Sequence, residues 1–160
     1  MEYFRKYYQA DPREFLVFDD RKLVYLVIPK VACTSINNMS ARAYGIHTEE
    51  IYRIHQREKW SAYQVGLLQE DYPGYCKFAF VRNPFSRLVS CYQDKVLSSG
   101  PDGLYLKEQT FPGISSEMSF ADFVQQVARI PDRLADRHFK SQYANLYHRG
   151  KLLVDYIGKF

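Results

Sequence analysis

Two short segments of the sequence place a basic side chain and hydroxyl groups directly after an apolar run. The first segment, residues 29–35, follows the apolar residues 23–28 and contains Lys30, Thr34 and Ser35. A lysine and hydroxyls beside the free N–H groups of a helix start can hold a phosphate or sulfate. The segment lacks the Gly-rich Walker A pattern, and its lysine precedes the turn. The alternative is a solvated lysine followed by an ordinary Ser/Thr helix cap.

The second segment, residues 81–92, has the same form. Arg82 stands at the end of an apolar run, and Ser90 follows about two helical turns later. Arg82 can bind a phosphate through its guanidinium fork while Ser90 donates a hydroxyl hydrogen bond. Ser86 shares a helix face with Ser90, because the two are four residues apart. The alternative makes Arg82 a structural ion-pair partner and Ser90 a neutral surface residue.

Strands are expected ahead of both segments. Residues 14–18 and 22–28 are β-rich runs separated by Asp19, Asp20 and Arg21, which predicts a hairpin. The second run is continuously apolar, as in a central strand covered on both faces. Residues 76–81 predict another buried strand.

Helices are expected after both segments. One should begin near Thr34 or Ser35, with Ile36, Met39 and Ala43 on its inner face. The other should begin after Asn83 as N-cap and Pro84 at the first position. Its apolar residues recur at helical spacing and predict a core face formed by Phe85, Leu88, Val89, Tyr92 and Val96.

The rest of the chain is less regular. We expect helix at about 60–70, a long loop over 98–116, helices over 119–129 and 134–147, and a last strand over 152–157. The order strand–loop–helix, twice over, predicts an α/β fold with a central parallel sheet and helices on its faces. The expected architecture is a P-loop-like three-layer sandwich, and 160 residues fit a single domain, 1–160.

Composition limits the classes of ligand that the protein could bind and the cellular compartments in which it could reside. A net charge of +4 is compatible with an anionic ligand but too weak for a nucleic-acid-binding protein. Cys33, Cys76 and Cys91 are odd in number and lack CxxC spacing, which argues against a disulfide framework or zinc site and favours a reducing compartment. No stretch of the sequence approaches a membrane span, and no signal peptide is visible.

Together the two segments resemble motifs of the PAPS-dependent sulfotransferases, in particular the carbohydrate sulfotransferase branch (sulfotransferase family 2). The first is similar to that family's 5′-phosphosulfate loop and the second to its 3′-phosphate motif, with weaker similarity at 136–139 and 155–160. The resemblance implies binding of the donor 3′-phosphoadenosine 5′-phosphosulfate (PAPS). The implied donor-binding residues are Pro29, Lys30, Val31, Ala32, Cys33, Thr34, Ser35, Arg82 and Ser90.

The resemblance also implies a reaction, the transfer of a sulfuryl group from PAPS to an acceptor hydroxyl without a metal. The acceptor would be a glycan or a small molecule. Lys30 would stabilise charge on the leaving oxygen. His55 would deprotonate the acceptor, because related sugar sulfotransferases carry a catalytic histidine between the two donor motifs. His138 is the second candidate, a structural role is open for both, and Glu49, Glu50 and Glu58 are further possible bases.

Two rival functions share the phosphate-binding logic. A P-loop-like nucleotide kinase would need a Walker A Gly-Lys pair and an acidic magnesium ligand at a strand end, where this sequence has Arg82. A non-catalytic domain would bind the desulfated donor (PAP) or an anionic glycan without turnover. Transfer of labelled sulfate from PAPS separates that domain from an enzyme.

The sequence departs from the family pattern in two places. Family members usually continue past the position of Phe160, so we expect either a fragment or a minimal form. The cysteine pair of animal secretory members is absent from residues 145–153. That absence favours a bacterial-like cytoplasmic member, and the alternative is the lumenal domain of a Golgi membrane protein.

Overall fold

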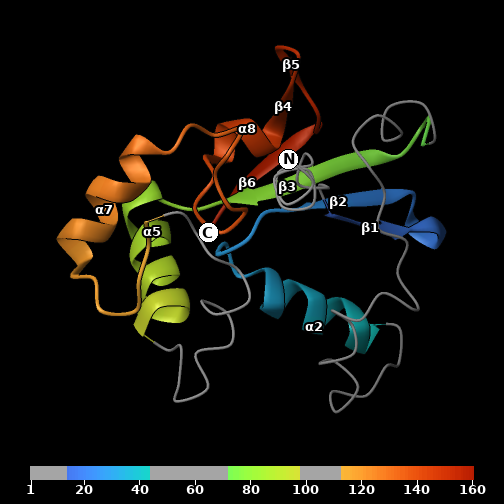
Figure 1. The fold of residues 1–160 in the computed structure, drawn as a ribbon. Helices are drawn as coiled ribbons and strands as arrows, with labels where there is room; N and C mark the ends of the chain where they lie inside the picture. The colour runs from blue at the N-terminus through green and yellow to red at the C-terminus, as the bar shows by residue number, and fades with distance from the viewer. Residues whose placement is uncertain (1–13, 44–71, 98–112) are drawn as a thin grey trace, which may run out of the picture. The chain divides into compact units, whose positions relative to one another are not determined.

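The computed structural model describes residues 14–43, 72–97 and 113–160 (Figure 1). These residues fall into two compact units. The sheet unit is formed by segments 14–43, 72–81 and 142–160, and the helical unit by segments 82–97 and 113–141. The predicted helix at 60–70 and most of the predicted loop at 98–116 lie outside the described residues.

The sheet unit is built on four strands in the order β1-β2-β3-β6. The strands are β1 (Glu14–Phe18), β2 (Leu23–Val27), β3 (Cys76–Val81) and β6 (Tyr156–Lys159). The single turn of 3-10 helix η1 (Asp19–Arg21) joins β1 to β2, and these two strands pair antiparallel. β2 pairs parallel with β3, and β3 pairs parallel with β6. The predicted hairpin and the central place of β2 are confirmed, and the fold is mixed α/β with a partly parallel sheet.

Both faces of this sheet are covered, as the continuous apolar run in β2 predicts. Side chains alternate along β2, so Tyr25 and Val27 face one side while Val24 and Leu26 face the other. The first side packs against the start of helix α2 (Cys33–Ala43), through Cys33 and Ile36. The second side packs against Leu146 of α8 (Gln142–Leu146) and against Leu153 and Val154, which follow strand β5 (Lys151–Leu152). Figure 1 shows α2 and α8 on opposite sides of the strands.

The inner face of α2 differs from the prediction. Met39 is 66% exposed and Ala43 is also exposed, whereas Asn37 and Ser40 are buried. Cys33 and Ile36 contact the sheet, and Asn37 and Ser40 lie four positions after them. All four residues therefore share one side of the helix. The buried Ser40 hydroxyl donates a hydrogen bond to the Ile36 carbonyl oxygen at 2.8 Å.

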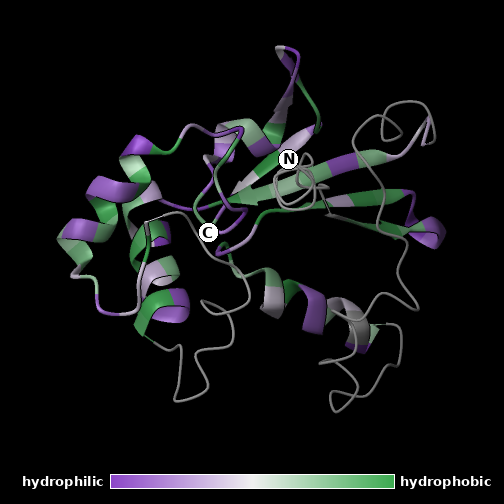
Figure 2. Ribbon diagram, viewed as in Figure 1, coloured by the Kyte–Doolittle hydropathy of each residue, from purple (hydrophilic) through white to green (hydrophobic). Residues whose placement is uncertain are grey.

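The helical unit contains α5 (Pro84–Tyr92), which continues as the π-helical turn η3 (Gln93–Leu97), and α7 (Phe120–Arg129). α7 is amphipathic, and its green and purple residues alternate along the ribbon in Figure 2. The predicted N-cap of α5, Asn83, is confirmed. The helix predicted over 119–129 is also confirmed as α7, and Ser119 is its N-cap. The core of the unit is formed by Cys91, Val96, Phe123, Ala135 and Phe139.

The predicted core face of α5 is only partly correct. Leu88, Tyr92 and Val96 pack in the core, but Phe85 is 80% exposed and Val89 is exposed as well. Arg87 is buried in their place. Its guanidinium donates to the carbonyl oxygens of Lys140 at 2.8 Å and Arg137 at 3.2 Å, which turns that side of the helix inward.

The C-terminal predictions need two corrections. Of the helix predicted over 134–147, the part Gln142–Leu146 is helical and forms α8. Residues 131–141 form successive turns instead, in which the Asp132 carboxylate binds the backbone N–H and hydroxyl of Ser141 in place of helical hydrogen bonds. The last strand starts at Tyr156 rather than at 152. The preceding residues form a small hairpin of β4 (Tyr147–His148) and β5 (Lys151–Leu152). Among the helices described, none has the length and apolar character needed to cross a membrane.

Candidate functional site

The loop that follows β2 has a strained backbone at two residues. Lys30 and Ala32 adopt left-handed conformations, with φ of 67° and 63°. This region costs a non-glycine residue about 1–2 kcal/mol. Pro29 and Val31 are buried on either side of Lys30 in the sequence, and Lys30 itself is half-buried. The two buried residues anchor this part of the loop. Such strain in non-glycine residues is concentrated at functional sites.

This loop leads directly into the first turn of α2. The first helical hydrogen bond runs from the Ile36 N–H to the Ala32 carbonyl oxygen at 3.0 Å. The N–H groups of Cys33, Thr34 and Ser35 precede it, so none of them has a partner inside the helix. Thr34 and Ser35 are exposed. Successive N–H groups beside left-handed residues form a concave site suited to an anion.

Tyr25 packs in the sheet on the side of this helix start, and sequence reasoning did not single it out. Its ring is fully buried and stacks on Phe78 with centroids 5.3 Å apart. Its hydroxyl has no hydrogen-bond partner among the described residues. Burial, with a smaller contribution from Cys33, raises the pKa of Tyr25 far above its usual value. The phenol is therefore neutral at physiological pH.

The second predicted segment starts α5 in a different way. Arg82 directly follows the last residue of β3, and both it and Ser90 are half-buried. The Asn83 side chain accepts hydrogen bonds from the N–H groups of Phe85 at 3.0 Å and Ser86 at 3.2 Å. This cap occupies two donors of the helix start. Anion binding here would therefore depend on the Arg82 and Ser90 side chains more than on the backbone.

His138 lies in the turn region of the helical unit and is 9% exposed. Its Nδ1 is 2.6 Å from Oδ1 of Asp136, and the same oxygen accepts the His138 backbone N–H at 2.8 Å. Burial lowers the pKa of His138, and the hydrogen bond between its ring and Asp136 opposes this shift. Sequence reasoning selected His138 but missed Asp136 and Arg87. An Asp two residues before a His was the available signal.

The structure does not describe the remaining predicted bases. His55, Glu49, Glu50 and Glu58 lie outside the described residues. Lys30 belongs to the sheet unit, and Arg82, Ser90 and His138 belong to the helical unit.

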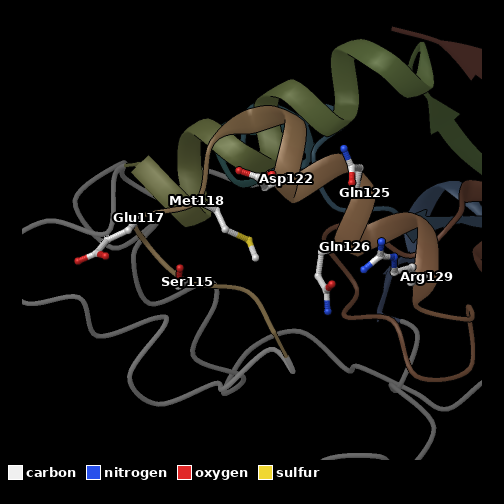
Figure 3. Close-up of a pocket in the computed structure, with 7 residues that line it drawn as sticks. All are labelled: Ser115, Glu117, Met118, Asp122, Gln125, Gln126 and Arg129. Carbon is white, nitrogen blue, oxygen red and sulfur yellow. The ribbon is translucent and has the colours of Figure 1, made fainter.

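A polar pocket of about 410 Å³ lies along α7 in the helical unit. Figure 3 shows Asp122, Gln125, Gln126 and Arg129 on the helix, with Ser115, Glu117 and Met118 on the segment before it. None of the predicted site residues lines this pocket. Within the described ranges no three His, Cys, Asp or Glu side chains gather into a group that could hold a metal ion.

A strained loop after a parallel strand, leading into a helix start, defines a class of α/β proteins that bind phosphate or sulfate groups. Comparison with known proteins is more specific. The model of the sulfotransferase family matches residues 13–160, and the chain belongs to that family.

The curated relatives include several carbohydrate sulfotransferases. Carbohydrate sulfotransferase 11 of Danio rerio is 30% identical over 94% of this chain and 50% of its own length. Carbohydrate sulfotransferase 12 of Mus musculus is 25% identical over 90% of this chain and 44% of its own length. Carbohydrate sulfotransferase 10 of Homo sapiens is 27% identical over 77% of this chain and 40% of its own length. The chain thus spans half or less of these relatives, and no solved structure matches it significantly.

Proposed function

We propose that this chain is a sulfotransferase domain that transfers a sulfuryl group from PAPS to a hydroxyl of a carbohydrate. The observation that carries the proposal is the loop after β2, where Lys30 and Ala32 are held in left-handed conformations beside the uncommitted N–H groups of α2. The family match and the names of the relatives support the reaction and the acceptor class. The proposal includes a single domain over residues 1–160 with the P-loop-like three-layer architecture.

The residues of the loop fit the anionic end of PAPS. Pro29, Lys30, Val31, Ala32, Cys33, Thr34 and Ser35 would hold the 5′-phosphosulfate, and Arg82 and Ser90 would hold the 3′-phosphate. β2 and β3 are parallel neighbours, and the two segments follow these strands in the sequence. In open α/β sheets, ligands bind beyond the carboxyl ends of parallel strands.

The proposed roles divide between binding and chemistry. When bound, PAPS supplies the activated sulfuryl group. Lys30 would stabilise the charge that grows on the leaving oxygen, and a histidine, His55 or His138, would take the proton of the acceptor hydroxyl. This scheme requires no metal.

The compartment is part of the proposal. The three cysteines form no disulfide among the described residues, with Cys91 buried and Cys76 exposed. Free thiols are typical of a reducing compartment, which favours the cytoplasm over the lumen of the Golgi. Fractionation of cells that express the whole protein tests this choice.

The first experiment is a thermal melt with PAP. Ligand at about one hundred times its dissociation constant should stabilise the fold by roughly 2.7 kcal/mol. A melting temperature that ignores PAP but rises with ATP and magnesium would favour a nucleotide kinase instead.

A pair of variants then tests the division of roles. Arg82→Ala should weaken PAP binding, because the 3′-phosphate carries the same charge in the ground and transition states. Lys30→Ala should lower the rate of labelled-sulfate transfer at saturating PAPS more than it lowers PAP affinity. An unchanged rate in Lys30→Ala would contradict the role given to Lys30. PAP binding without any transfer by the wild type would favour a non-catalytic domain.

A further inference from the structure

Asp136 and His138 form a nearly buried hydrogen-bonded pair. The His138 side chain is 11% exposed and that of Asp136 is 15% exposed. Oδ1 of Asp136 accepts the backbone N–H of His138 at 2.8 Å and lies 2.6 Å from Nδ1 of its ring. An ionised carboxylate can only accept hydrogen bonds, so the neutral imidazole must have its proton on Nδ1. Its basic lone pair is therefore on Nε2.

The turn that contains this pair is fixed from α5. Arg87 is buried, and its guanidinium donates to the carbonyl oxygen of Arg137, which lies between the paired residues, and to that of Lys140, two residues after His138. Phe139 packs in the core of the helical unit. The imidazole is thus held by its own carboxylate partner, by its backbone and by the turn around it.

From this geometry we infer that Asp136 is a positioning residue for His138, which acts as the general base toward the acceptor hydroxyl. The inference rests on the proposed sulfuryl transfer and selects between the two histidines. As the acceptor oxygen bonds to the sulfur of PAPS, its proton moves to Nε2 of His138. The bond from sulfur to the bridging phosphate oxygen breaks, and PAP leaves.

The charges around His138 are compatible with this role. Burial is the largest influence on the pKa of His138 and lowers it, and the cations Lys95 in η3 and Arg137 in the turn lower it further. Asp136 acts in the opposite direction. Arg87 also hydrogen-bonds to this turn, and the Asp132 carboxylate binds Ser141 close by. The net shift leaves the ring neutral, and able to accept a proton, at neutral pH.

The tautomer of His138 is a direct test that does not need activity. NMR of the full chain labelled with ¹⁵N-histidine reports which ring nitrogen is protonated, and His138→Gln identifies the signal. We expect the Nδ1–H tautomer at neutral pH in the wild type and its loss in Asp136→Asn, because an amide can donate as well as accept. The control is Asp132→Asn, since Asp132 binds Ser141 in the same region without contacting a histidine. A wild-type ring protonated on Nε2 overturns the inference.

The kinetic test uses the same variants. Asp136→Asn and His138→Gln should lower kcat by about a hundredfold to ten-thousandfold, with PAP affinity unchanged, because neither residue is assigned to a phosphate. Asp132→Asn should transfer sulfate at the wild-type rate. Wild-type kcat in Asp136→Asn, or loss of activity in His55→Gln with an active His138→Gln, overturns the inference. Failure of the wild type to bind PAP would instead refute the proposed function, and the tautomer measurement stands apart from that outcome.

Discussion

The N-cap of α5 allows the stability of the helix to be separated from its proposed affinity for phosphate. Asn83 accepts two backbone hydrogen bonds, from Phe85 and Ser86. Replacing such a cap with alanine costs about 1 kcal/mol of the free energy of unfolding. In a chain of this size that corresponds to a melting temperature lower by roughly 2–4 °C.

Asn83→Asp is the informative partner of Asn83→Ala. Aspartate caps a helix as well as asparagine does, and its charge interacts favourably with the helix dipole, so the melting temperature should equal or exceed that of the wild type. The new charge adjoins Arg82, the proposed partner of the 3′-phosphate. Two like charges about 4 Å apart repel by about 1 kcal/mol even in water. PAP should therefore bind roughly fivefold or more weakly.

Thermal melts and calorimetric titration with PAP measure the two effects on the same samples. If Asn83→Asp is as unstable as Asn83→Ala, the side chain does not act as the cap that the hydrogen bonds indicate. If Asn83→Asp is stable and binds PAP with wild-type affinity, the 3′-phosphate does not lie near the start of α5. The two results refute separate steps of the reasoning.

Three further predictions concern the core and the buried titratable groups. Tyr25→Phe should raise the free energy of unfolding by about 1 kcal/mol in urea titrations, because it removes a buried hydroxyl that has no described partner. Since the folded pKa of Tyr25 is raised, the wild type should also lose stability as pH rises above about 10, and the variant should lose less. Gly158→Ala should cost about 1–3 kcal/mol, because a Cβ there would lie 2.5 Å from Cε1 of Phe80; the double variant with Phe80→Leu should recover part of the loss. His138 has a lowered folded pKa, so its contribution to stability is present above pH about 6.5 and lost as pH falls; His138→Gln should flatten that acid slope in melts, and an unchanged slope would contradict the burial of a neutral ring.

The sequence by itself determined the elements whose signals are local. The turn at Asp19–Arg21 and the cap at Asn83, with Pro84 directly after it, each depend on a few neighbouring residues, so they could be predicted without the fold. The helix over 119–129 could be predicted from its local apolar spacing. The apolar run in β2 predicted a strand covered on both faces, because a strand with one solvated face would alternate. The two strand–loop–helix segments, with Lys30 and Arg82 after their strands, could be predicted because their apolar runs and helix starts are local sequence signals.

Tertiary structure alone decided which faces are buried and which side chains meet. Met39 and Phe85 belong to apolar patterns of helical spacing, yet both are exposed, because contacts of Cys33, Ile36 and Arg87 orient their helices. The segment after α7 forms turns because polar side chains such as Asp132 compete for backbone groups, which helical periodicity does not register. The left-handed backbone at Lys30 could not be predicted from the sequence, because glycine and, less often, asparagine are the residues that commonly adopt this conformation. The Asp136–His138 pair likewise depends on a turn that Arg87 holds from fifty residues away, a distance over which no local pattern operates.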